Sequence, residues 1–231
     1  MENSDMEKTK IQIHSDEFHK IWDKKKLWQE VSWLGIGMWK LPFDAFIIQE
    51  LLFKVQPDFV IETGTNFGGS SLFYASILKL IGKGRVITID IKDKASGIDE
   101  IKSRLDLSIT RVIGDSVSNE TYKQMLSIAG ANKTFFVILD SWHTKEHVLK
   151  ELRIYSHLIH MGSYIIVEDT HVSGHPIKWK WGDGPYEAVH EFLQENSTFA
   201  VDKRCEKLAM TFNPCGFLRK VLHGGRHNGD S

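Results

Sequence analysis

Short apolar runs alternate with longer amphipathic segments from residue 58 onward. The runs are DFVIETG at 58–64, GRVITIDI at 84–91, ITRVIGD at 109–115, TFFVILD at 134–140 and GSYIIVEDT at 162–170. Runs this short, rich in β-branched and aromatic residues, are typical of strands buried on both faces. Helix-length segments such as GGSSLFYASILKLI separate four of them. The alternation predicts an α/β fold with a mostly parallel, doubly wound sheet.

Amphipathic segments flank this region. Residues 15–30 space apolar side chains among Lys and Glu, and residues 43–55 do so before Pro57, so both predict helices in an N-terminal extension over 1–56. Residues 186–194 predict another helix. FAVDK and LAMTFNP predict closing strands, paired as a hairpin through Arg204 and Cys205. We therefore expect one Rossmann-like domain over 57–222 with a C-terminal antiparallel strand, and a loose tail at 223–231.

Composition excludes several classes of protein. Of 231 residues, 42% are hydrophobic and 26% charged, as in globular domains. The 29 Lys and Arg against 30 Asp and Glu give a net charge of -1, so no basic excess indicates nucleic acid as a partner. Two cysteines favour a reduced, cytoplasmic setting, and no apolar run reaches the roughly 18 residues of a membrane span. The apolar content of the first 40 residues fits either a homo-oligomer contact or an intramolecular cover.

A glycine-rich turn, ETGTNFGGSS at 62–71, follows the first predicted strand and opens a helix. At this place an α/β sheet presents backbone amides to a ligand. The sequence has neither the GxGxxG spacing of a dinucleotide site nor the GK[ST] of a nucleoside-triphosphate site. A ligand contact and a plain strand-to-helix connection are equally compatible with the turn.

Acidic residues end the next two predicted strands. Asp90 comes one βα unit after the glycine-rich turn, where a carboxylate can accept hydrogen bonds from both hydroxyls of a ribose. Asp115 and Ser116 end the third strand at the same edge, where they could meet an adenine amino group. These positions favour a nucleoside ligand; capping of the following helix is the alternative for each acid.

Three further carboxylates end the fourth and fifth strands. Asp140 ends one, and Glu168 with Asp169 ends the other. If the two strands are neighbours, roughly 5 Å apart, three anions share one cleft and need a cation or shared protons. Oxygen ligands favour Mg²⁺, Ca²⁺ or Mn²⁺ over zinc. The alternative is that one of the acids caps a helix or pairs with Lys or Arg.

His143 follows Asp140 in the segment DSWHTKEH. A histidine beside a metal-bound hydroxyl is a candidate general base, since its unperturbed pKa lies near neutral. The same segment spells H-x-x-E-H through His143, Glu146 and His147, the signature of inverted zinc peptidases. That interpretation requires both histidines on one helix, whereas His143 stands where a strand has just ended.

A long loop, DTHVSGHPIKWKWGDGP at 169–185, follows the fifth strand. Its length indicates a lid over the substrate pocket, with His171 and His175 as lining residues. Trp179 and Trp181 could stack against a sugar face or could pack the loop onto the body of the protein.

Taken together, these segments resemble the cephalosporin hydroxylase and rhamnosyl O-methyltransferase family of S-adenosylmethionine-dependent enzymes. The resemblance runs from about residue 33 to 221. It rests on the order of WLG, KLPFD, PDFVIETGTNFGGSS, ILDSWHTKEHVLKEL, GSYIIVEDT, GPYEAVHEFL and FNPCGFLRKV. It implies a Rossmann-like methyltransferase fold.

The resemblance also implies site residues. Glu62 and Gly64 would lie at the methionine end of S-adenosylmethionine, Asp90 on its ribose, and Asp115 with Ser116 near its adenine. A divalent metal, Mg²⁺ in the first place, would be held by Asp140, Glu168 and Asp169. The full predicted cofactor-binding set is Glu62, Gly64, Thr65, Asn66, Gly68, Ser70, Asp90, Asp115 and Ser116.

These expectations amount to a metal-assisted O-methyltransferase with Asp140 and His143 as catalytic residues. The acceptor would be a hydroxyl of a sugar, glycolipid or natural product, activated by the metal and deprotonated by His143. Two alternatives stay open: a hydroxylase-type tailoring enzyme, as some family names state, and a nucleoside-binding protein without turnover. The sequence shows no evident iron site of two histidines and one carboxylate, which favours methyl transfer.

Overall fold

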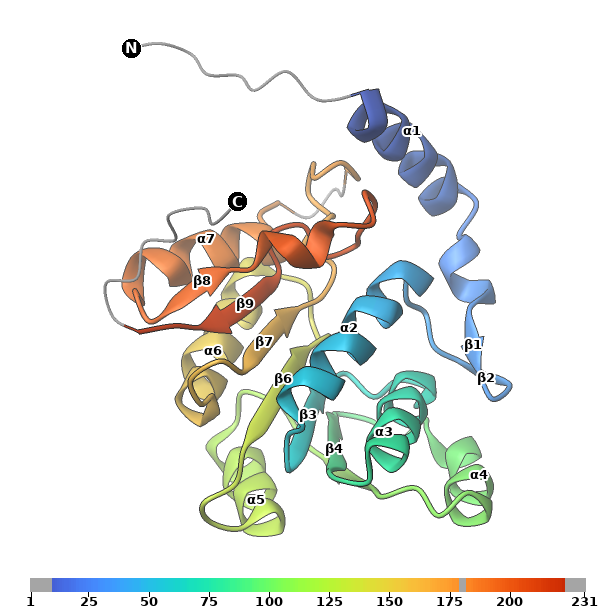
Figure 1. Cartoon of the computed structure of the whole chain (residues 1–231), viewed down its shortest axis with the longest axis vertical. Helices are drawn as coiled ribbons and strands as arrows, with labels where there is room; N and C mark the ends of the chain where they lie inside the picture. The colour runs from blue at the N-terminus through green and yellow to red at the C-terminus, as the bar shows by residue number, and fades with distance from the viewer. Residues whose placement is uncertain (1–9, 179–181, 223–231) are drawn as a thin grey trace.

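A seven-stranded sheet forms the centre of the computed structural model, which describes residues 10–178 and 182–222 (Figure 1). Its strand order is β5-β4-β3-β6-β7-β9-β8, with β3 to β7 parallel and β9 antiparallel to both neighbours. The strands are β3 (Phe59–Thr63), β4 (Arg85–Asp90), β5 (Ile109–Ile113), β6 (Phe135–Leu139), β7 (Tyr164–Val167), β8 (Phe199–Val201) and β9 (Phe217–Lys220). The predicted mostly parallel, doubly wound sheet is confirmed.

Helices cover both faces of the sheet. One face packs on α2 (Pro42–Val55) and α3 (Gly69–Ile81), with the short α4 (Asp99–Arg104) beside them. The other face packs on α5 (Asn119–Ala129), α6 (Lys145–Tyr155) and α7 (Pro185–Glu195). The sequence pattern produces both layers, because alternate residues of one strand face opposite ways. In β6, Phe136 and Ile138 join the first core, while Val137 joins the second.

The closing strands differ in part from the prediction. β8 lies within the predicted FAVDK segment, but LAMTFNP forms no strand, and β9 comes after it in GFLRKV. Met210 and Phe212 instead pack on Leu41 in a small separate cluster, which Trp22 and Trp28 cover. These apolar residues therefore attach the N-terminal extension to the domain instead of extending the sheet.

The N-terminal extension contains two helical pieces instead of the single helix predicted over 15–30. The α1 helix (Lys10–Lys24) ends before Lys26, which has a left-handed φ of 53°, and the 3₁₀ turn η1 (Leu27–Glu30) follows. A small hairpin of β1 (Ser32–Trp33) and β2 (Ile36–Gly37) then leads to α2. The bend at Lys26 brings Trp28 onto the domain while α1 extends past it (Figure 1).

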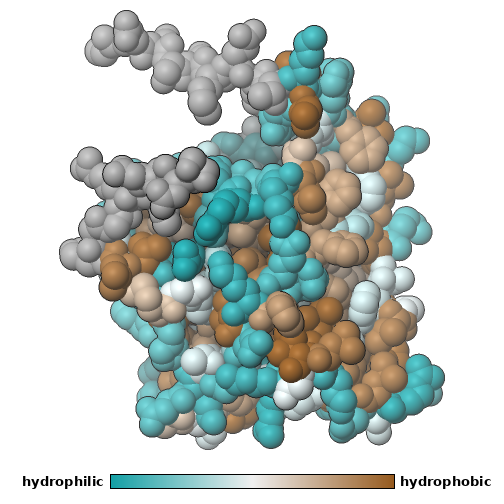
Figure 2. Space-filling model, viewed as in Figure 1, coloured by the Kyte–Doolittle hydropathy of each residue, from teal (hydrophilic) through white to brown (hydrophobic). Residues whose placement is uncertain are grey.

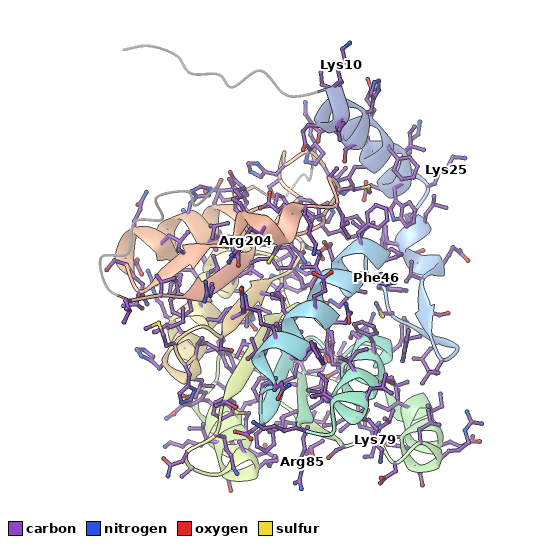
Figure 3. All side chains as sticks on the ribbon, in the orientation of Figure 1. Lys10, Lys25, Phe46, Lys79, Arg85 and Arg204 are labelled. Atoms are coloured by element: carbon purple, nitrogen blue, oxygen red, sulfur yellow. The ribbon has the colours of Figure 1, made fainter. Side chains whose placement is uncertain are left out.

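Apolar side chains remain on the surface of this extension and of α2. Phe43, Phe46 and Phe53 are exposed along α2, and Figure 2 shows hydrophobic atoms on this face, with Phe46 labelled in Figure 3. Both cysteines are free, with Cys205 buried. Among the described residues, no helix has the length and apolar character needed to cross a bilayer.

Gly64, directly after β3, allows two segments of the cleft to meet. Its φ is +89°, and a Cβ there would lie 1.8 Å from the backbone carbonyl oxygen of Asp140. We expect Gly64→Ala to lower the free energy of unfolding by about 3–5 kcal/mol, through positive-φ strain plus overpacking. Gly82→Ala is the matched control: φ is +80° but nothing lies within 4 Å, so only the strain of about 1–2 kcal/mol applies. Urea denaturation of both variants tests this; equal losses would contradict the steric argument.

Candidate functional site

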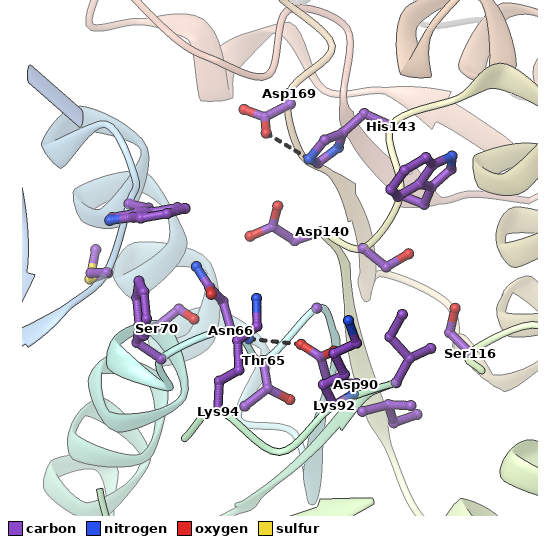
Figure 4. Close-up of a pocket in the computed structure, with 18 of the residues that line it drawn as sticks. Thr65, Asn66, Ser70, Asp90, Lys92, Lys94, Ser116, Asp140, His143 and Asp169 are labelled. Carbon is purple, nitrogen blue, oxygen red and sulfur yellow. Dashed lines mark hydrogen bonds and ion pairs between the residues drawn. The ribbon is translucent and has the colours of Figure 1, made fainter. Parts of the chain in front are cut away.

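A cavity of about 610 Å³ opens at the carboxyl ends of the parallel strands (Figure 4). The segments that follow β3, β4, β5, β6 and β7 each contribute to its wall, and the N-terminal extension closes another side. Parallel strands all end at the same edge, so residues far apart in sequence converge there. Of the nine predicted cofactor residues, seven line the cavity: Gly64, Thr65, Asn66, Ser70, Asp90, Asp115 and Ser116.

A hydrogen bond connects the glycine-rich turn to the end of β4. Asp90 accepts a hydrogen bond from the backbone amide of Asn66 at 2.9 Å and another from that of Lys92 at 3.1 Å. Asn66 has a left-handed φ of 45°, a conformation in which asparagine is enriched. The Asp90 carboxylate is thereby fixed at the cavity wall, where its remaining lone pairs can accept hydrogen bonds from a ligand (Figure 4).

Glu62 and Gly68, the other two predicted cofactor residues, lie outside the cavity lining. Glu62 is buried beneath the turn, and its carboxylate accepts hydrogen bonds from the hydroxyls of Ser70, Ser71 and Thr88. Burial raises the pKa of Glu62 to about 7, against the lowering effect of Lys40 and these hydroxyls. Gly68 precedes α3, with its Cα facing Ile98. The structure thus places Glu62 as a support for Ser70 and not at the cavity surface.

At the other end of the cavity, Asp140, His143 and Asp169 come together (Figure 4). One potential ligand atom from each lies within 4.8 Å of the others, and His143 Nε2 is 3.2 Å from Asp169 Oδ2. The strands that carry them, β6 and β7, are parallel neighbours, as the sequence analysis assumed. Two carboxylates and an imidazole are a donor set that fits a divalent cation.

Glu168 is not part of this group. Its carboxylate is buried 3.1 Å from the ammonium of Lys40, at ion-pair distance, and the same ammonium donates a hydrogen bond to Asp140 Oδ2 at 2.8 Å. This arrangement matches the alternative in which one of the acids pairs with a lysine.

Lys40 contacts two of the predicted metal ligands, although the sequence did not indicate it as a site residue. It lies just before α2, and only 2% of its side chain is exposed. Burial alone would lower its pKa, but Asp140 and Glu168 outweigh burial and hold the pKa of Lys40 well above its usual value. Lys40 is therefore a buried counter-charge to Asp140 and Glu168. The available signal was a lone lysine in the apolar run GMWKLP, ahead of a domain rich in strand-end acids.

The extension supplies the remaining wall of the cavity. Asp23, Trp28 and Trp39 line it from α1, η1 and the segment before α2. His171, from the loop after β7, lines it too; burial lowers its pKa to about 3, so it is neutral at physiological pH. His175 instead pairs with Glu187 at 2.8 Å. Trp179 and Trp181 lie outside the described residues.

The two histidines of the H-x-x-E-H segment are separated. His143 precedes α6 and belongs to the Asp140 group, whereas His147, on α6, lies 3.1 Å from the hydroxyl of Ser116. A zinc peptidase needs both on one helix face as ligands. The geometry therefore does not support the peptidase interpretation.

The fold and the position of the cavity define the class of the protein. Solved structures of CmcI resemble it: one described as a Mg-SAM complex has a TM-score of 0.63 at 19% identity, covering 84% of this chain and 78% of that one. MycE, a methyltransferase from the mycinamycin biosynthetic pathway, was solved with Mg, SAH and mycinamycin VI. It has a TM-score of 0.54 at 19% identity and covers 80% of this chain and 51% of its own. These likenesses establish a Rossmann-like methyltransferase fold.

Sequence comparison then gives the family. The family model described as Rhamnosyl O-methyltransferase/CmcI matches residues 25–221. The rhamnosyl O-methyltransferase of Mycobacterium bovis is 33% identical over 208 residues, 88% of this chain and 84% of the relative. That of Mycobacterium leprae is 32% identical over 207 residues, 88% and 89% of the two chains. The chain belongs to the rhamnosyl O-methyltransferase/CmcI family, as the sequence resemblance predicted.

Proposed function

We propose that the protein transfers the methyl group of S-adenosylmethionine to a hydroxyl of a sugar or of a sugar-bearing natural product. One observation carries this proposal. A single cavity has residues suited to a nucleoside, including Asp90 and Ser116, at one end, and Asp140, His143 and Asp169, a set suited to a metal ion, at the other. The relatives support it, since the curated ones are named rhamnosyl O-methyltransferases. The MycE structure was solved with a natural-product ligand.

The cofactor would lie along the glycine-rich turn. Its ribose would meet Asp90, which the turn holds in place, and its adenine would lie near Asp115 and Ser116. Its methionine end would approach Gly64 and Ser70, with Glu62 beneath them. The sulfonium methyl would then point toward Asp140, where the acceptor must come in line with it.

A divalent cation would be held by Asp140, Asp169 and His143, whose donor atoms already lie close together. When bound, such an ion orients an acceptor hydroxyl and lowers its pKa. The two carboxylates suit Mg²⁺ or Mn²⁺. Glu168, the other predicted ligand, would take part by releasing Lys40.

The residues around that end would align the acceptor and take its proton. Trp28 and Trp39, whose rings pack edge to face, line the cavity and would give a sugar ring an apolar surface to rest against. The Nε2 atom of His143 can accept the hydroxyl proton or ligate the ion, but it cannot do both at once. The first role makes His143 the general base; the second leaves proton removal to a nearby carboxylate or to water.

Calorimetric titration with S-adenosylhomocysteine, with and without Mg²⁺, tests the cofactor before the acceptor is known. We expect micromolar binding under both conditions, because the nucleoside wall and the acidic group use different residues. Methyl transfer to rhamnosyl and related glycosides should then require S-adenosylmethionine and stop in EDTA. Absence of cofactor binding would overturn the proposal. Product that forms only with iron and oxygen would favour the hydroxylase alternative.

A further inference from the structure

The segment FNPCG at 212–216 lies beside the turn that follows β7. It precedes β9, which is antiparallel to β7, so it continues along the partner side of β7 beyond the end of that strand. The backbone amide of Val167, the last residue of β7, donates a hydrogen bond to the carbonyl of Gly216 at 2.9 Å. Four residues later, the amide of His171 donates to the carbonyl of Phe212 at 2.9 Å. The turn and the segment are therefore joined at both ends.

Between these two bonds, a side chain takes the place of a backbone carbonyl. The backbone amide of Asp169 donates a hydrogen bond to Oδ1 of Asn213 at 3.0 Å. Asn213 has no exposed surface, and its Nδ2 has no partner among the described residues. Only the oxygen end of a carboxamide can accept a hydrogen bond from an N–H group. Oδ1 is therefore the atom through which the side chain of Asn213 holds the turn.

The residue held in this way has an uncommon backbone conformation. Asp169 has a φ of +58°, in the left-handed region that few residues other than glycine adopt. In this conformation its carboxylate lies in the cavity, with Oδ2 3.2 Å from Nε2 of His143. The direction of a side chain depends on the φ of its own residue. Rotation of Asp169 back to a negative φ would therefore carry its carboxylate away from His143 and Asp140.

We propose that Asn213 is a positioning residue for the metal ion, which it affects by fixing the backbone of Asp169. This inference rests on the proposed function, which puts a divalent cation at Asp140, His143 and Asp169. Asn213 does not line the cavity, so its effect on the ion passes through Asp169. Mg²⁺ demands near-ideal geometry from its ligands, and residues that orient a ligand commonly change metal affinity by about 10–100-fold.

Electron paramagnetic resonance of Mn²⁺ measures the affinity on which the inference depends. Asn213→Leu keeps the branched shape of the side chain but removes the acceptor, so it should weaken Mn²⁺ binding by at least about tenfold. Asn213→Asp keeps an acceptor oxygen in either protonation state, so its affinity should stay within about threefold of the wild type. Tyr164→Phe is the matched control, because it breaks a buried hydrogen bond to Asp202 at the start of the same strand, β7. It should leave Mn²⁺ binding unchanged.

The pattern across these variants separates positioning from a general loss of structure. All of them should bind S-adenosylhomocysteine as the wild type does, because the nucleoside end uses other residues. Asn213→Ala, with the same expected loss, replaces Asn213→Leu if leucine prevents folding. Three results would each overturn the inference: wild-type Mn²⁺ affinity without the acceptor, an equal loss in Asn213→Asp, or a similar loss in Tyr164→Phe. A wild type that binds no Mn²⁺ would instead overturn the metal site of the proposed function, and the inference with it.

Discussion

Replacing Lys40 with methionine is expected to lower the free energy of unfolding by about 3–5 kcal/mol at pH 8. Methionine keeps much of the apolar stem but removes the ammonium that lies 2.8 Å from Asp140 and 3.1 Å from Glu168. Both carboxylates would then face each other without a counter-charge. Breaking a buried ion pair from one side is costly because the remaining charge stays desolvated.

The loss should depend on pH in a defined direction. Burial raises the pKa of Asp140 and of Glu168, and Lys40 is the main influence that lowers them. Without Lys40 both values rise further above those of the unfolded chain, which lie near 4. Acids whose pKa is raised by folding bind extra protons when folded, so they lose stability as pH rises. The deficit of the variant should therefore be smaller at pH 5 than at pH 8.

Urea denaturation at the two pH values, in EDTA, measures this deficit. The double variant Lys40→Met/Glu168→Gln should recover part of the lost stability, because it removes one of the two carboxylates left without a counter-charge. Lys79→Met, which breaks an exposed pair with Asp106, should change stability little. If Lys40→Met lowers the free energy of unfolding by less than about 1 kcal/mol, and by the same amount at both pH values, Lys40 does not act as a counter-charge to the two buried acids.

The sheet could be predicted because its strands obey a simple rule. Parallel strands buried on both faces must be short and apolar throughout, and DFVIETG and TFFVILD both became fully buried strands. LAMTFNP also contains apolar residues, but Met210 and Phe212 pack on Leu41 and on residues of the extension. Local pattern cannot distinguish these outcomes, because the competing contacts lie more than 160 positions apart in the chain.

The sequence predicted which residues meet at the site, but not how each side chain points. The shared edge of parallel strands brings Asp90, Asp115, Asp140 and Asp169 to one cavity, as their strand-end positions required. Which of Glu168 and Asp169 reaches the cavity could not be derived, because both lie beyond the end of β7, where strand alternation no longer sets the direction of a side chain. Asp169 reaches the cavity, and Glu168 turns inward to a lysine from another element. That lysine lies in the KLPFD segment, which by itself does not indicate the acids that it contacts, so only the three-dimensional structure connects it to them.

Replacing Asp169 with asparagine should weaken binding of Mn²⁺ by at least about 100-fold, the scale on which even supporting residues affect a metal site. Asp169 is partly exposed in the cavity and lies beside His143 without a bond to Lys40, so its loss leaves the buried ion pairs intact. Electron paramagnetic resonance of Mn²⁺ measures the affinity directly. Asp106→Asn, which removes an exposed carboxylate far from the cavity, is the matched control.

The same variant separates the metal end of the cavity from the nucleoside end. Asp169→Asn should bind S-adenosylhomocysteine as the wild type does, since Asp90 and Ser116 are untouched, while methyl transfer falls by at least about 100-fold. His143→Ala then distinguishes the two roles of that histidine: weaker Mn²⁺ binding identifies a ligand, and unchanged Mn²⁺ binding with a slower rate identifies the base. Wild-type affinity for Mn²⁺ in Asp169→Asn would show that the ion binds elsewhere, with Glu168 in exchange for Lys40 as the next arrangement to test.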